Sequence, residues 1–165
     1  HRDLHSFPTR RSSDLCFDIF RPVSTPGSII QAFLEKRKRH TLASIWDHFS
    51  MITRKGEQVA WHNGHPGDYQ PMHRLDEVSS MFKRAQITSE YIDVHNWIFT
   101  PASFHLVMLD INVLGYTNLQ VCNFFPTDGC EFIVQLKKMS DPSPTASDPQ
   151  QRKQQLLNML EENRP

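Results

Sequence analysis

The chain has 165 residues, which suits one domain or part of a larger one, and its 18 lysine and arginine residues balance 18 aspartate and glutamate residues. A chain without net charge gives no electrostatic reason to expect nucleic acid as a partner, because domains that bind nucleic acid usually present a basic face. The sequence holds no apolar run of about 18 residues, so it implies no membrane span.

The first fifteen residues, 1–15, resemble the conceptual translation of a short-read sequencing adapter, since every codon of the adapter fits the residue at its position. We expect this segment to be an unstructured artefact and exclude it from fold reasoning, as a fusion scar would be excluded. The natural sequence then begins at or near Cys16, with an unknown number of residues missing before it. A kinase-like start at His1-Arg2-Asp3-Leu4 is discarded, because Pro8 stands where that loop needs asparagine.

Three helices are expected in the first half of the natural sequence. Thr25 and Thr41 are good N-caps for the first two, and Gly56 follows the second as a natural stop. A third helix is expected over 76–86. On each helix apolar residues recur at helical spacing: Ile29, Ile30, Phe33 and Leu34 on the first, Leu42, Ile45, Trp46, Phe49 and Ile52 on the second, and Val78, Met81, Phe82 and Ala85 on the third.

A helix and a β-hairpin are expected in the second half. Thr100-Pro101 repeats the cap-and-proline signal after an extended stretch at 91–99, and Gly115 ends the helix. Residues 119–125 are expected to form a strand, and apolar and polar residues alternate over 130–138, beyond a Pro-Thr-Asp-Gly turn. This pattern predicts two antiparallel strands.

The C-terminal segment 139–165 is expected to be a disordered linker with a short helix, through which the chain could join a neighbouring domain. Its first part is rich in serine, proline and aspartate and cannot bury a core.

Cys16, Cys122 and Cys130 form no Cys-x-x-Cys pair, so neither a disulfide framework nor a structural zinc site is expected. Free cysteines favour a reducing, cytoplasmic location.

Seven short phrases, taken in chain order, form a familiar pattern. They are Cys16-Phe17-Asp18-Ile19-Phe20-Arg21-Pro22, Arg39-His40-Thr41, Asp47-His48, Asp93-Val94-His95, Phe99-Thr100-Pro101-Ala102-Ser103-Phe104, Gly115-Tyr116, and Glu131-Phe132-Ile133-Val134-Gln135-Leu136-Lys137-Lys138. With these phrases, residues 16–138 resemble the C-terminal portion of a bacterial class I S-adenosyl-L-methionine (SAM)-dependent methyltransferase.

The resemblance implies an α/β fold, the C-terminal part of a Rossmann-like class I methyltransferase, with helices packed on a partial sheet that ends in an antiparallel hairpin. It implies SAM as cofactor of the parent enzyme and a small-molecule or saccharide hydroxyl as methyl acceptor. The Gly-rich turn and acidic residue that hold SAM in the family are absent from this sequence. We therefore expect a fragment that carries the acceptor-side insert, binds no cofactor and is inactive alone.

Asp93 and His95 are the candidate catalytic residues. Residues two apart in an extended segment project from one face, and a carboxylate beside an imidazole raises its basicity. Such a histidine could accept the proton of the acceptor hydroxyl and contribute about 10² to 10⁴ in rate. Four further residues are candidates for acceptor binding: His40, Asp47, His48 and Trp97. For His48 a structural role at the border of the buried helix face is the alternative.

Two other functions stay open. One is a non-enzymatic α+β binding module that uses a histidine-rich loop to engage a partner. The other is a metal-dependent hydrolase fragment that uses His62, His65, Asp68 and His73, although their spacing matches no defined zinc pattern and we expect no metal.

Overall fold

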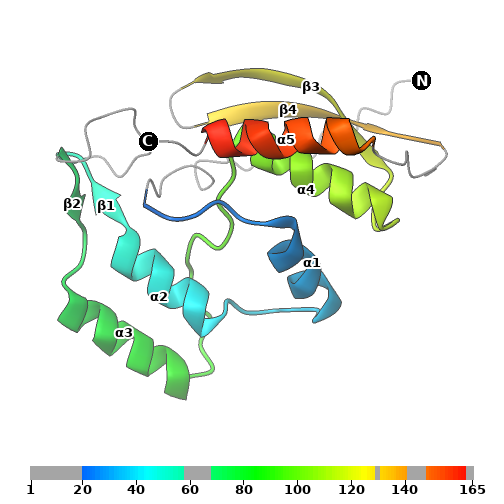
Figure 1. The fold of residues 1–165 in the computed structure, drawn as a ribbon. Coiled ribbons are helices and arrows are strands. Elements are labelled where there is room, and N and C mark those ends of the chain that lie inside the picture. Colours follow the sequence, from blue (N-terminus) through cyan, green and yellow to red (C-terminus); the bar gives the residue numbers. More distant parts are fainter. Residues whose placement is uncertain (1–19, 58–67, 129–130, 141–147, 163–165) are drawn as a thin grey trace, which may run out of the picture.

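The computed structural model describes residues 20–57, 68–128, 131–140 and 148–162, which form five α-helices and two small antiparallel sheets (Figure 1). The fold is therefore mixed α/β, as expected. The adapter-like segment 1–15, Cys16 and residues 141–147 of the expected linker lie outside the described residues.

The first helix, α1 (Pro26–Leu34), begins where the sequence predicts. The hydroxyl of Thr25 accepts a hydrogen bond from the backbone N–H of Ser28 at 3.3 Å, and Pro26 occupies the first turn. The helix ends at Leu34, because Lys36 adopts a left-handed φ of 50° that an α-helix cannot continue.

Helices α2 (Leu42–Met51) and α3 (Leu75–Ile87) pack on each other, with the rings of Trp46 and Phe82 5.4 Å apart. Helix α2 ends at Met51, several residues before the stop predicted at Gly56. It ends there because Ile52 adopts an extended conformation and leads into a strand. That strand, β1 (Thr53–Arg54), pairs with β2 (Gln70–Pro71), a two-residue ladder that the sequence did not predict.

The stretch 91–99, which was expected to be extended, forms neither a helix nor a strand. It lies beside the segment that precedes α1. The N–H of Ser24 donates to the carbonyl of Ile98 at 2.8 Å, and the N–H of Ile98 donates to the Ser24 hydroxyl at 2.9 Å. Val94 and Ile98 are buried, so this stretch is part of the core.

Helix α4 (Pro101–Val113) begins with a capping box between Thr100 and the fully buried Ser103. It covers one face of the hairpin formed by β3 (Leu119–Asp128) and β4 (Glu131–Lys138). The ring of Phe104 lies 5.8 Å from that of Phe132 on this face, whereas Ile133 on the opposite face is 65% exposed. The alternation predicted for the second strand is therefore confirmed.

Helix α5 (Pro149–Glu162) confirms the predicted short helix and lies along α4 (Figure 1). The Arg152 guanidinium donates to both carboxylate oxygens of Asp110, at 2.6 and 2.9 Å. At the other end of the helix, the carboxylate of Glu162 accepts from the N–H of Ala102 at 2.8 Å. The segment thus makes specific contacts that a plain linker would lack.

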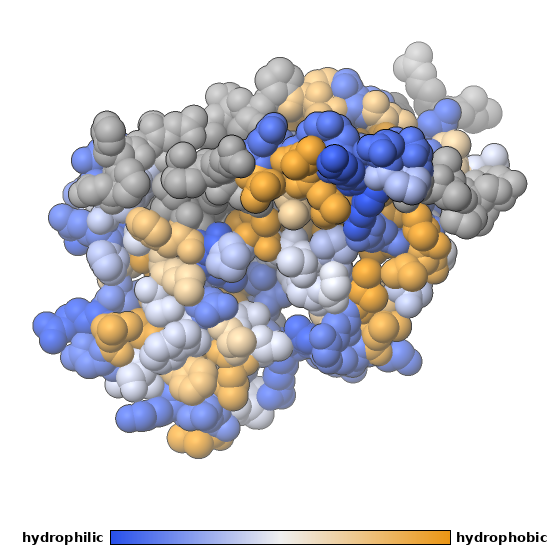
Figure 2. Space-filling view, in the orientation of Figure 1, coloured by the Kyte–Doolittle hydropathy of each residue, from blue (hydrophilic) through white to orange (hydrophobic). Residues whose placement is uncertain are grey.

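The helix contacts fall into two groups. Helix α2 packs with α3, while α4 packs with α1, α5 and β3. Figure 2 shows apolar surface over α5 and around α1 on this face, and the exposed side chains there include Phe33, Leu34, Leu156, Leu157 and Leu160. No described helix is long and apolar enough to cross a membrane.

The bidentate pair between Arg152 and Asp110 should hold α5 against α4. We expect a double-mutant cycle with Arg152→Ala and Asp110→Ala to give a coupling free energy of about 0.5–1 kcal/mol, because both side chains are partly buried and the geometry is bidentate. Urea unfolding followed by circular dichroism measures it.

The exposed pair between Arg74 and Asp76 is the matched control, since both side chains are more than two-thirds exposed. Its cycle should give a coupling near zero. Equal coupling free energies in the two cycles would show that the ion pair of Arg152 and Asp110 stabilises the packing of α5 on α4 no more than an exposed pair would.

Candidate functional site

Two predicted site residues, His48 and His95, contact each other. The backbone N–H of His95 donates to Nδ1 of His48 at 3.3 Å, and the two imidazole rings lie 4.9 Å apart at 69°. On the other side of the same residue, the Arg21 guanidinium donates to the carbonyl of His95. Both backbone polar groups of His95 are therefore held by side chains from distant parts of the sequence.

The burial of this cluster follows from its place in the fold. His48 lies one turn after Ile45 on the inward face of α2, and it is 8% exposed. Arg21 is also 8% exposed, while His95 is half-buried in the irregular stretch before α4. A buried guanidinium is stable only when its donors are satisfied, which the carbonyl of His95 helps to do.

The hydrogen bond to Nδ1 of His48 sets the tautomer of its neutral imidazole. A backbone N–H can only donate, so Nδ1 of His48 must accept, and a neutral His48 then carries its proton on Nε2. The aromatic row continues beyond His48 through Phe49, whose ring lies 5.5 Å from that of His73.

Asp93 does not join the cluster. Its side chain is exposed and forms no hydrogen bond or ion pair within the described residues, so the expected pairing with His95 is not seen. The reason is that 91–99 is irregular rather than a strand of a sheet, so the two-residue alternation that motivated the pairing does not apply.

The other acceptor-binding candidates lie at separate places. His40 is hydrogen-bonded through Nε2 to the hydroxyl of Tyr91 at 2.7 Å, in an exposed position. Asp47 is half-buried on α2, and Trp97 is half-buried two residues after His95. Only His48 and His95 are thus shown in direct contact.

The sequence did not single out Arg21 or Asn96. Arg21 stands in one of the family-like phrases, and an arginine between Phe20 and Pro22 in an apolar stretch is the signal that could have marked it. Asn96 is a neighbour of His95, and its buried Oδ1 atom has no hydrogen-bond partner within the described chain. An unsatisfied buried carbonyl oxygen is costly, so a ligand hydroxyl at this position would be stabilised.

The metal-site alternative gains no support from the described residues. The Asp68 carboxylate forms an ion pair with Lys55 at 3.2 Å, and His73 lies 4.0 Å from the Glu77 carboxylate. Among the described residues no group of three metal-ligating side chains comes together. His62 and His65 lie outside the described residues.

The described residues do not fit SAM. The cofactor needs a glycine-rich turn between a strand and a helix. Of the glycines in the described ranges, Gly27 lies in the first turn of α1, Gly56 follows β1 at φ 61°, and Gly115 follows α4 at φ 71°. None of these three stands between a strand and the start of a helix.

Comparisons with protein-family models, with curated proteins and with solved structures found no match to this chain.

The contact between Arg21 and His95 predicts a large effect on stability. Arg21→Met should lower the free energy of unfolding by about 1–3 kcal/mol, because the partly buried carbonyl of His95 loses its charged donor. Urea denaturation of the variant measures the loss.

Arg39→Met is the matched control, since Arg39 is exposed and the same side-chain change there should stay within about 0.5 kcal/mol. If both variants unfold at the same urea concentration, the contact between Arg21 and His95 does not stabilise the fold.

Proposed function

We propose that this chain forms the acceptor-binding part of a class I SAM-dependent methyltransferase, with His95 at the acceptor site. One observation carries the proposal. Three of the stretches that resemble the family lie far apart in the sequence, and each supplies one member of the cluster formed by Arg21, His48 and His95. A chance resemblance of isolated phrases gives no reason for their side chains to meet.

In this proposal the His95 imidazole accepts the proton of an acceptor hydroxyl. A histidine suits the task because imidazole is the most common general base in enzymes, and a well-placed general base contributes about 10² to 10⁴ in rate. His48 is a positioning residue, since it acts on the backbone N–H of His95. Arg21 has the same role at the His95 carbonyl. With its peptide groups held, the imidazole has fewer orientations to lose when an acceptor binds.

The acceptor that we propose is a small molecule or saccharide bearing a hydroxyl group. The unsatisfied Oδ1 of Asn96 could accept a hydrogen bond from a hydroxyl beside His95. The half-buried indole of Trp97 offers an apolar face of the kind against which sugar rings pack. Tyr91 and His40 add exposed hydrogen-bonding groups on the same stretch and on the segment before α2.

The cofactor would be held by residues outside those described, so no step of the reaction is assigned to it. We propose that the 165-residue chain binds no SAM and is inactive alone. Equilibrium dialysis against labelled SAM should leave the purified chain without bound cofactor at 1 mM ligand, on the order of the weakest affinities that matter for an enzyme.

The decisive test begins with the gene. The genomic sequence upstream of the Cys16 codon should encode a strand followed by a glycine-rich turn. In the protein expressed from that longer frame, His95→Gln should lower kcat for methyl transfer from labelled SAM to a panel of methyl glycosides by about 10² to 10⁴. Its effect on the KM for SAM should be small, because His95 is assigned to the acceptor.

Asp93→Asn is the matched control, since Asp93 is exposed and makes no polar contact within the described residues. It should leave kcat within about threefold of the parent, which is the range of neutral surface changes. A small complete domain encoded at Cys16 without an upstream glycine-rich turn would contradict the proposal and favour the binding module. Full activity of His95→Gln would contradict the role of His95.

A further inference from the structure

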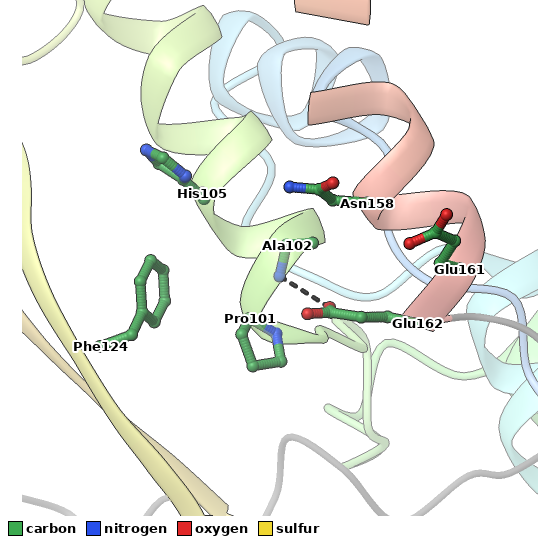
Figure 3. A pocket seen from close by; sticks show the side chains of 7 residues that line it. All are labelled: Pro101, Ala102, His105, Phe124, Asn158, Glu161 and Glu162. Atoms are coloured by element: carbon green, nitrogen blue, oxygen red, sulfur yellow. Dashed lines mark hydrogen bonds between the residues drawn. The ribbon is translucent and has the colours of Figure 1, made fainter. Parts of the chain in front are cut away.

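A surface pocket of about 400 Å³ lies between α4, α5 and β3 (Figure 3). None of the predicted site residues lines it. Pro101 and His105 come from the first turns of α4, Phe124 comes from β3, and Asn158, Glu161 and Glu162 come from the end of α5. The volume falls within the range of pockets that hold small organic ligands.

The polar side of the pocket is acidic. Among the described residues that line it, two are glutamates and none is lysine or arginine. One oxygen of Glu162 already accepts from the N–H of Ala102, while Glu161 forms no hydrogen bond or ion pair within the described residues. Both glutamates stand in the last turn of α5, where the helix carbonyl groups add to the negative potential. The charge of this side favours a cation.

The opposite side is apolar and aromatic. The Phe124 ring lies on the strand side of α4 beside His105, and its edge-to-face contact with His105 has a centroid distance of 5.7 Å. Pro101 closes the bottom of the same side in this view. An aromatic face attracts a cation and also packs against an apolar body, so both parts of an organic amine would be stabilised here.

His105 adds a neutral hydrogen-bonding group. Burial lowers the pKa of its imidazole below the usual value, so the ring is uncharged at neutral pH and does not repel a cation. Within the described part of the chain its ring nitrogens have no hydrogen-bond partner, and a neutral imidazole has one nitrogen that can accept from an ammonium group. Asn158 also points toward this space from α5.

We propose that this pocket binds a small organic cation, a primary amine whose ammonium group lies between Glu161, Glu162 and His105 and whose apolar body packs on Phe124 and Pro101. An anion is disfavoured, because the N-terminal turn of α4 is already capped by Thr100, Ser103 and the Glu162 carboxylate. A purely apolar ligand would leave the carboxylates without a counter-charge.

The test uses phenethylamine as the probe and the 165-residue chain labelled with ¹⁵N. Titration should shift the backbone resonance of Ala102 and the side-chain amide resonances of Asn158 saturably, with a dissociation constant on the order of 1 mM for so small a ligand. 2-Phenylethanol has the same apolar body without the charge and should bind at least about threefold more weakly. Equal binding of the two probes, or no saturable shift with phenethylamine, overturns the proposal.

A pair of variants tests whether the carboxylate of Glu161 binds the ammonium group. Glu161→Gln should weaken phenethylamine binding by about threefold, and Glu57→Gln, an exposed glutamate on the loop after β1, should leave it unchanged. Both side chains are exposed, so neither substitution should alter the fold. Equal affinities of the two variants would place the amine elsewhere.

The pH dependence gives an independent readout. Protonation of His105 would add a positive charge beside the bound ammonium, so affinity should fall as the pH drops through the lowered pKa of His105, below its usual value of 6.5. The other ionisable groups that line the pocket are Glu161 and Glu162. His105→Gln should remove this fall in affinity, and an unchanged pH profile in this variant would show that the amine does not contact His105.

Discussion

The hydrogen bonds to the His95 peptide join the two packing groups of the fold. His48 comes from the group formed by α2 and α3, and Arg21 comes from the segment that leads into α1 and so belongs to the group around α4. The stretch 91–99 runs between the two groups and pairs with no strand among the described residues. Because buried peptide groups must be hydrogen-bonded, side chains supply the bonds that a strand would have made.

The same constraint sets the position of α4. Ile98 is hydrogen-bonded to Ser24 on both its N–H and its carbonyl, and Thr100 caps the helix two residues later. The path from His95 to the first turn of α4 is therefore held at His95, Ile98 and Thr100. Helix α4 in turn packs against the hairpin on one face and against α5 on another. A displacement at His95 would thus be passed to the pocket between α4 and α5 as well as to the cluster around His95.

The sequence predicted the elements whose signals are local. Thr25, Thr41 and Thr100 mark three helix starts through their capping hydroxyls, and the alternation at 132–136 marks the inward face of β4. It did not predict the pairing of Thr53 with Pro71, because a two-residue ladder leaves no periodicity to read. The candidate site was predicted in part: His48 and His95 come together, but through a backbone bond, which no side-chain pattern could reveal.

The central claim is that His48 accepts a hydrogen bond from the His95 amide, and the tautomer of His48 tests it most directly. Long-range ¹H–¹⁵N correlation spectra of the labelled chain distinguish the two neutral forms of an imidazole. The account predicts that neutral His48 carries its proton on Nε2 and that the His95 amide exchanges slowly with solvent. A proton on Nδ1 of His48, or a rapidly exchanging His95 amide, would contradict it.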